Sequence, residues 1–332
     1  GQHREMLDQV LRAFSVTPDY DLDIMETQQT LSGITTKALC GLQDVLLAAK
    51  PDVVLVHGDT TTTFTAALAA FYQCIPVGHV EAGLRSFDRY SPYPEEINRC
   101  LTGTLAEYHF APTEANAANL ARESKPGQVF ITGNTVIDAL KTTVRAEYVF
   151  EEDALNSLDF SARRIVLMTA HRRENLGTPM RHMFTAIRRV VDETPDVKLI
   201  YPMHMNPSVR DMARNCFSGQ PRIHMIEPMD VLDFHNVMAR AYLIMTDSGG
   251  IQEEAPSLGK PVLVMRDTTE RPEGVEAGTL RLVGTGEQPI YDAVMELLRD
   301  PEKYHQMEHA ANPYGDGHAS EYIAQILEKN IR

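Results

Sequence analysis

Residues 246–254 read TDSGGIQEE, and they follow the apolar run LIM at 243–245. This order predicts a strand at 243–245, a turn at Ser248, Gly249 and Gly250, and a helix that begins directly after the turn. Backbone N–H groups at a helix start are unpaired, glycines allow a ligand to approach closely, and the helix dipole favours negative charge there. The segment therefore predicts a phosphate-binding unit, although a plain N-cap with a tight turn has the same spacing.

The same alternation of short apolar runs and helical spacing continues on both sides of this segment. The run at 53–56 follows a helical pattern that Pro51 ends, and its unbroken apolarity predicts a strand buried on both faces. Strands separated by helices imply right-handed crossovers and doubly wound parallel sheets, so the expected fold class is α/β with two Rossmann-like domains. The expected strands are 53–56, 75–80, 129–131, 165–168, 197–201, 223–226, 243–245, 261–265 and 280–283, and the expected helices of the first half are 31–45, 64–72, 97–108 and 136–143.

The chain of 332 residues is longer than one hydrophobic core usually supports, which predicts two domains. The alternation blurs across the polar stretch 151–164. We therefore place one domain at 1–157 and the other at 158–314. A helical pattern starts almost directly after Gly1 without an initiator Met, and we interpret the chain as one that lacks its first strand.

Composition excludes several classes of function. The net charge of −15 argues against a nucleic-acid partner, because proteins that bind a phosphate backbone usually present a basic face. No apolar run is long enough for a membrane span and no signal peptide is visible, so we expect a cytoplasmic protein. The four cysteines form no CxxC pair and lie in or beside apolar runs, as buried reduced thiols do.

Neither a metal nor another cofactor is expected. The twelve histidines show no HExxH spacing or comparable ligand spacing. No GxGxxG follows a predicted strand, although a missing first strand is where such a nicotinamide-binding turn would lie.

Ionisable residues follow four of the predicted strands. Asp59, Glu81, His171 and Asp247 each come just after a strand, and the carboxyl ends of parallel strands meet at one edge of a sheet. Asp59 and Glu81, with Glu95 at the next helix start, predict an acidic cluster. Crowded carboxylates differ in proton affinity, as acid–base chemistry requires.

Each carboxylate also has a structural interpretation. Asp59 precedes a helix as an N-cap residue does, and Arg85 is a nearby ion partner for Glu81. Glu95 follows Pro94, and proline at the first helical position before an acidic residue is typical of a helix start.

Candidate residues in the second half of the chain also have both a functional and a structural interpretation. His171 and Arg172 suit a diphosphate, although a solvated basic turn has the same composition. Glu254, one turn into the helix after the glycines, is either a contact to ribose hydroxyls or an exposed carboxylate on the helix face.

Seven ordered segments resemble the bacterial non-hydrolysing UDP-N-acetylglucosamine 2-epimerases. They span nearly the whole chain, which is far more specific than any single motif. The segments are QHREM at 2–6, VHGDT at 56–60, HVEAGLR at 79–85, PEE at 94–96, HRREN at 171–175, SGGIQEE at 248–254 and NPYGDG at 312–317.

The resemblance implies a glycosyltransferase-B-like fold, with two domains around a cleft, a homodimer, and a last helix within 315–332 that crosses back onto the first domain. It also implies reversible conversion of UDP-N-acetylglucosamine to UDP-N-acetylmannosamine. A base removes the carbon 2 proton as UDP leaves carbon 1, and UDP then adds back to the 2-acetamidoglucal while a proton reaches the opposite face. Two faces need two proton-transfer groups, which fits the acidic cluster.

The resemblance also assigns roles position by position. The catalytic residues are Asp59, Glu81, Glu95 and His171, the last assisting at the departing diphosphate. The substrate-binding residues are His171, Arg172, Phe234 near uracil, Ser248, Gly249 and Gly250 at the diphosphate, and Glu254 at the ribose. Positions that bind a second, activating substrate molecule in some relatives match Gln2, Glu95, Arg172 and His204, although Glu5 stands where certain relatives have Gln.

Three alternatives remain open from the sequence: a glycosyltransferase of the same fold, a hydrolysing 2-epimerase, and a UDP-sugar-binding chain without turnover. The family's opening strand and its Gly-Thr-Arg-Pro-Glu turn, whose arginine helps to hold the phosphates, have no match here. We therefore expect this polypeptide alone to be poorly folded or nearly inactive.

Overall fold

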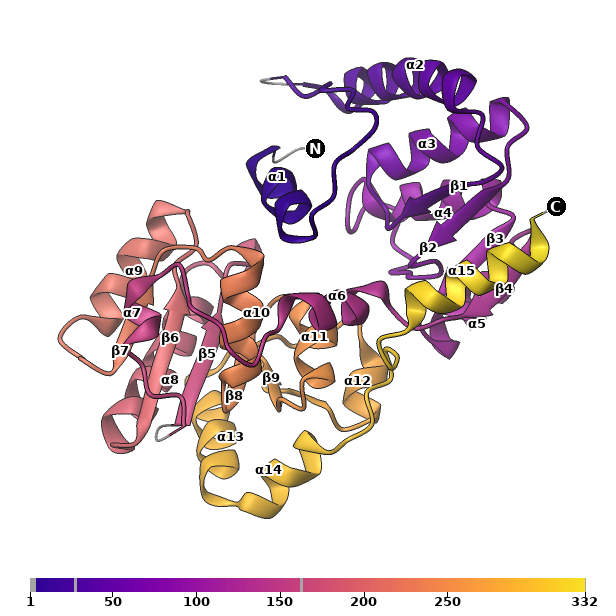
Figure 1. The fold of residues 1–332 in the computed structure, drawn as a ribbon. Coiled ribbons are helices and arrows are strands. Elements are labelled where there is room, and N and C mark those ends of the chain that lie inside the picture. The colour runs from indigo at the N-terminus through magenta and orange to yellow at the C-terminus, as the bar shows by residue number, and fades with distance from the viewer. Residues whose placement is uncertain (1–3, 27–28, 162–163, 332) are drawn as a thin grey trace. The chain divides into compact units, whose positions relative to one another are not determined.

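The computed structural model describes residues 4–26, 29–161 and 164–331, with no side chains described for 4–6 and 173. The chain forms two compact units, shown in Figure 1: unit 1 comprises Gly1–Ala139 and Tyr314–Arg332, and unit 2 comprises Leu140–Pro313. The division therefore lies at 139/140, earlier than the 157/158 boundary that we predicted. The reason is that Leu140, Phe150 and Leu155 are buried in the core of unit 2, although the surrounding sequence is polar.

Unit 1 contains a parallel sheet whose described strands run in the order β1-β2-β3-β4. These strands are β1 (Val54–His57), β2 (Val77–Val80), β3 (Tyr108–Ala111) and β4 (Gln128–Ile131). The helix predicted for 97–108 was too long, because Tyr108 begins β3, a strand of mixed Tyr-His-Phe-Ala composition without an apolar run. The expected burial of 53–56 on both faces was also wrong, since Leu55 in β1 is 48% exposed.

Helices cover the sheet of unit 1. Ile323 and Leu327 of the last helix pack against Val80 and Phe110 of the strands, and this helix, α15, lies beside the sheet in Figure 1. Asp138 binds the start of α15 by accepting hydrogen bonds from the backbone N–H groups of Ala319 and Ser320. The helices are α1 (Arg4–Ala13), α2 (Leu31–Ala49), α3 (Thr61–Tyr72), α4 (Glu95–Leu105), α5 (Glu114–Arg122), α6 (Thr135–Thr143), which continues into unit 2, and α15 (Ala319–Asn330).

Unit 2 contains a parallel sheet in the order β10-β9-β8-β5-β6-β7. The six strands expected in this half are all present: β5 (Arg164–Thr169), β6 (Val197–Pro202), β7 (Ile223–Ile226), β8 (Leu243–Thr246), β9 (Val262–Val264) and β10 (Leu280–Leu282). Chain order reverses at β5, which lies between β6 and β8. Ligands of open α/β sheets bind beyond the strand ends at such a reversal.

Apolar side chains of β5 alternate between two cores, as successive residues of a strand do. Val166 and Met168 lie in the core beneath α8 and α13, and Ile165 and Leu167 lie in the core beneath α10 and α11. The helices of unit 2 are α7 (Asp153–Asn156), the 3-10 helix η1 (Arg173–Asn175), α8 (Thr178–Glu193), α9 (Pro207–Phe217), α10 (Val231–Arg240), α11 (Ile251–Ser257), α12 (Pro272–Glu276), α13 (Glu287–Arg299) and α14 (Pro301–Glu308).

Two compositional expectations can be compared with the described residues. None of their helices has the length and apolarity needed to cross a membrane. The expectation of buried thiols was wrong, because Cys40 and Cys74 are exposed and Cys100 and Cys216 are half-buried. An apolar neighbourhood in sequence does not decide which face of a helix a thiol occupies.

Candidate active site

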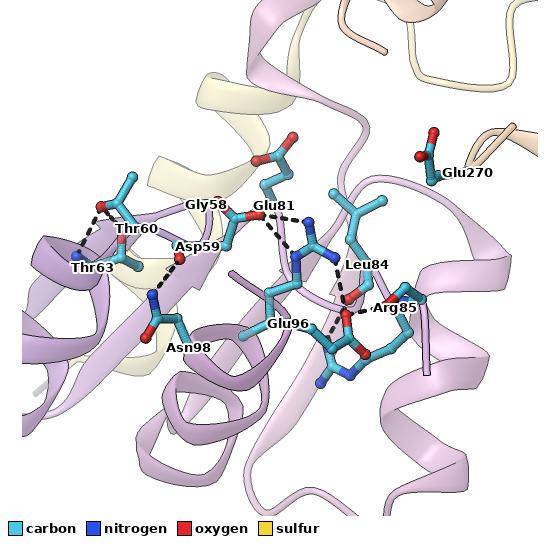
Figure 2. A network of polar contacts seen from close by, with 12 residues as sticks. Gly58, Asp59, Thr60, Thr63, Glu81, Leu84, Arg85, Glu96, Asn98 and Glu270 are labelled. Carbon is cyan, nitrogen blue, oxygen red and sulfur yellow. Dashed lines mark hydrogen bonds and ion pairs between the residues drawn. The ribbon is translucent and has the colours of Figure 1, made fainter. Parts of the chain in front are cut away.

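Asp59 lies in the turn between β1 and α3, where Arg99 of α4 binds its carboxylate. The Nε and Nη2 atoms of Arg99 lie 2.8 and 2.7 Å from Asp59 Oδ2. Asn98 Nδ2 donates to the Asp59 carbonyl at 2.9 Å (Figure 2). The N-cap interpretation of Asp59 is wrong, because Thr60 caps α3 by accepting from the Thr63 N–H at 3.2 Å. The carboxylate of Asp59 is thus positioned by a cation from a neighbouring helix.

Glu81 lies in the turn after β2 with a left-handed backbone, φ +63°. Non-glycine residues in this region cost free energy and cluster at functional sites. The Glu81 Oε2 atom would lie 3.3 Å from a Cβ added at Gly58, in the turn after β1, and Asn134 Nδ2 lies 3.5 Å from Oε1. Asp59 and Glu81 therefore occupy neighbouring turns at one edge of the sheet.

The predicted ion pair between Glu81 and Arg85 is not the pair that forms. Arg85 Nε instead donates to Glu123 Oε1 at 2.6 Å, across 38 positions of sequence. This pairing arises because the chain folds α5 back beside the β2 turn, which the local sequence does not reveal.

Glu95 is the first residue of α4, and Pro94 is the N-cap residue rather than the first helical position. Residues three and four positions apart share a helix face, so Glu95 shares its face with Asn98 and Arg99, both of which bind Asp59. Glu95, Asp59 and Glu81 are thus brought to one region of unit 1.

The adjacent Glu96 has a different, structural environment. It is buried and accepts hydrogen bonds from the backbone N–H groups of Ser86 and Phe87, each at 3.0 Å. It also pairs with Arg99 at 3.0 Å, so it holds both the 86–87 loop and the guanidinium that binds Asp59.

His79 of β2 supports the turn that carries Asp59. Its Nε2 lies 2.8 Å from the Gly58 carbonyl oxygen, and burial lowers the pKa of the ring to about 4. The neutral ring therefore donates Nε2–H to the carbonyl and holds Gly58, which has φ +71°, in place.

In unit 2, the turns after β5 and β8 meet at the reversal of strand order. The fully buried carboxylate of Asp247 accepts from the backbone N–H groups of His171 and Arg172 at 3.0 Å and from Asn175 Nδ2 at 3.0 Å. His171 Nδ1 lies 3.2 Å from Asp247 Oδ1. Asp247 thereby fixes both the loop and the imidazole of His171.

The Ser248-Gly249-Gly250 turn leads into α11, whose N-cap is Gly250 without any side-chain cap bond. Arg271 crosses this turn: its Nη1 lies 3.0 Å from where a Cβ on Gly249 would stand, and its Nε donates to Glu253 at 2.7 Å. The turn thus has two glycines, whose backbone a ligand can approach closely, and a guanidinium beside them. Both features suit the binding of an anion.

Glu254 is largely buried, so the interpretation as an exposed helix-face carboxylate is wrong. Its Oε2 lies 3.7 Å from His235 Nε2, and His235 Nδ1 lies 2.8 Å from the Thr143 hydroxyl. Phe234, next to His235 in α10, is half-buried against the apolar core that includes Ile251.

The remaining predicted residues are partly described. The rings of His204 and His171 stack with centroids 5.8 Å apart, and burial together with His171 lowers the pKa of His204. Arg172 Nη1 lies 3.1 Å from Glu174 and 3.6 Å from Glu270. Gln2 lies outside the described residues.

Sequence reasoning gave no role to Arg99, His79, His235 or Arg271. Arg271 follows no strand and belongs to no glycine turn, so only its contact with Gly249 reveals it. Asp247 was noted as a strand-end residue, but its bonds to the His171 loop depend on the parallel pairing of β5 with β8.

The fold and these residues define a nucleotide-sugar enzyme with two Rossmann-like α/β units of the glycosyltransferase-B-like class. The chain belongs to the UDP-N-acetylglucosamine 2-epimerase family, whose model matches residues 1–328.

Individual relatives agree over nearly the whole chain. The UDP-N-acetylglucosamine 2-epimerase of Bacillus subtilis is 58% identical over 328 residues, which are 98% of this chain and 85% of the relative. The crystal structure of the Neisseria meningitidis enzyme bound to UDP-GlcNAc has a TM-score of 0.88 at 50% identity, covering 99% of this chain and 90% of that one. A UDP co-structure from S. aureus has a TM-score of 0.87 at 53% identity, covering 98% and 87%.

Proposed function

We propose that this chain interconverts UDP-N-acetylglucosamine and UDP-N-acetylmannosamine without hydrolysis. The observation that carries the proposal is the placement of Asp59 and Glu81 on neighbouring turns, with Glu95 on the helix whose side chains bind Asp59. Membership of the epimerase family supports this reaction, as do the relatives that are bound to UDP-GlcNAc and UDP.

The proposed reaction is an elimination followed by a re-addition. One carboxylate takes the carbon 2 proton, the electron pair forms the carbon 1–carbon 2 double bond, and the carbon 1–oxygen bond breaks so that UDP leaves with its electron pair. UDP then adds back to carbon 1 while a second group protonates carbon 2 from the opposite face. The acid and the base need unlike surroundings.

The surroundings of the carboxylates do differ. Asp59 pairs with the guanidinium of Arg99 at 2.7 Å, and the contacts of Glu81 include the amide of Asn134, whose Nδ2 lies 3.5 Å from Glu81 Oε1. We assign the proton transfers to Asp59, Glu81 and Glu95 together, without dividing the two faces among them.

UDP is proposed to bind unit 2. The Ser248-Gly249-Gly250 turn and Arg271 hold the diphosphate, Arg172 adds charge, Glu254 with His235 binds the ribose, and the segment of Phe234 receives uracil. His171 assists departure of the diphosphate: its Nδ1 faces Asp247 Oδ1 at 3.2 Å, which leaves Nε2 for the ligand.

The chain is further proposed to act as a cytoplasmic homodimer. Light scattering on the purified protein tests the dimer. An activating second substrate molecule at Gln2, Glu95, Arg172 and His204 is proposed because His204 stacks directly on His171. A hyperbolic initial-rate curve that added substrate does not change would argue against it.

Incubation with UDP-N-acetylglucosamine in D2O, followed by proton NMR, tests the reaction. We expect UDP-N-acetylmannosamine with deuterium at carbon 2 in both sugar nucleotides, and turnover at a full rate would refute the expectation that this polypeptide alone is nearly inactive. Free N-acetylmannosamine with UDP would instead indicate a hydrolysing enzyme. Tight UDP binding without deuterium uptake would indicate a binding protein, and sugar transfer to an added acceptor would indicate a glycosyltransferase.

A further inference from the structure

The end of α14 carries two histidines one helical turn apart. His305 lies in its last turn, His309 is its C-cap residue, and their side chains are 61% and 75% exposed. The ring centroids are 5.7 Å apart. Together with Glu308, they offer one potential ligand atom each within 4.8 Å of one another, which no other group of His, Cys, Asp and Glu among the described residues does.

The hydrogen bonds of the two rings determine which nitrogen can bind a cation. His305 Nδ1 lies 2.8 Å from Glu308 Oε2, and His309 Nδ1 lies 2.9 Å from the carbonyl oxygen of His305. A carboxylate and a carbonyl only accept hydrogen bonds, so each neutral ring carries its proton on Nδ1. Both Nε2 atoms therefore keep a free lone pair.

This arrangement matches the known design of histidine metal sites. Residues four positions apart lie on one helix face, and one potential ligand atom of each ring lies within 4.8 Å of the other. Histidines that bind metals usually donate their other N–H to a carboxylate or a backbone carbonyl, as both rings do here. The carbonyl end of α14 and the charge of Glu308 also favour a cation.

We propose that His305 and His309 form a surface site for a divalent transition-metal ion, with Glu308 supporting His305 from behind and water completing the coordination. Imidazole ligands suit Zn²⁺, Ni²⁺ and Cu²⁺, whereas Mg²⁺ prefers carboxylates and water. The site uses none of the residues proposed for epimerisation. Its two histidines have the spacing of those in HExxH, with Gln306 where that motif has Glu, so the statement that the histidines show no comparable ligand spacing was wrong.

Calorimetric titration of metal-stripped full chain with Zn²⁺ tests the site. The double variant His305→Asn/His309→Asn is expected to bind one equivalent fewer than the wild type, and each single variant to bind that equivalent at least about tenfold more weakly. Glu308→Gln removes the carboxylate behind His305 and is expected to weaken Zn²⁺ binding by about tenfold. Mg²⁺ should give no such signal.

His318→Asn provides a matched control. His318 is a surface histidine paired with Glu321 at 3.2 Å and three positions away, but it has no histidine one turn along the helix. The His318→Asn substitution should leave Zn²⁺ binding unchanged. Zn²⁺ should raise the melting temperature of the wild type but not of the double variant, while both should melt alike in EDTA. Equal stoichiometry in the wild type and the double variant, or no binding by the wild type, would overturn the proposal.

Discussion

Three carboxylates carry the proposed chemistry at the scale of single residues. Asp59→Asn, Glu81→Gln and Glu95→Gln each keep the side-chain shape but remove the acid or base. Each should slow deuterium entry at carbon 2 by about 10²–10⁴-fold. Glu114→Gln is the control, because Glu114 is also acidic and in a first helical turn but is exposed on α5. Exchange at the wild-type rate in any of the three would remove that residue from the mechanism.

Asp247 positions the loop and the imidazole of His171. The carboxylate of Asp247 accepts hydrogen bonds from several N–H groups. Asp247→Asn replaces one of its oxygens with an NH2 group, which is itself a donor and cannot accept these bonds. We expect a lower melting temperature and a kcat reduced by about tenfold or more, because the amide no longer fixes the His171 tautomer. A shifted pH profile of kcat would mark the positioning role, since loss of stability alone leaves that profile unchanged.

His79 should make unit 1 sensitive to acid. Its folded pKa of about 4 lies below the unfolded value of 6.5, so the unfolded state binds the proton first as the pH falls. Stability should therefore decrease from about pH 6.5 to about pH 4, by about 3 kcal/mol for this one group. Thermal melts across that range should show a smaller decrease for His79→Gln, which retains an N–H for the Gly58 carbonyl. Parallel decreases in both proteins would contradict this assignment.

At the scale of elements, a glycine allows the β2 turn to pack on α5. Gly83 has φ +92°, and a Cβ there would lie 2.2 Å from the backbone oxygen of Asn116. Gly83→Ala should therefore cost more than about 2 kcal/mol of unfolding free energy, measured by urea denaturation. Gly103→Ala in α4 is the control, because its Cβ would meet side-chain atoms only at 3.6 Å or beyond. It should be neutral or stabilising by up to about 1 kcal/mol.

Some elements were predictable and others were not. The strands of unit 2 are mostly apolar because they are covered on both faces, and their pattern was sufficient although β6, β7 and β10 each contain one basic residue. Strand β3 reads Tyr-His-Phe-Ala. Its His109 is buried, and the ring Nε2 is hydrogen-bonded to the Pro126 carbonyl oxygen at 2.7 Å. A buried histidine looks polar in the sequence, so Tyr108 was assigned to the preceding helix and 109–111 to no element.

At the scale of the whole molecule, the last helix completes unit 1 with residues more than 200 positions from the strands that it covers. Ile323 is 5% exposed and packs in the cluster with Val80 and Phe110. Ile323→Ala should cost about 2–5 kcal/mol. Hydrogen exchange should then accelerate in β2 and β3 but not in β5 of unit 2. The exposed Glu328→Ala is the control, and equal acceleration in both units would contradict the division of the chain.

The sequence by itself determined the α/β class, the strands of unit 2 and the residues that follow the strand ends, because periodicity and strand-end position are local properties. It also contained the seven segments that resemble the epimerases. Only the tertiary structure decided that Thr60 rather than Asp59 caps α3, that Arg85 pairs with Glu123, and that Arg271 lies against Gly249. The last two contacts join residues from different elements, and their partners are chosen by how strands and helices pack, which no local pattern encodes. The Thr60 cap is itself local, but Asp59 instead binds Arg99 of another helix.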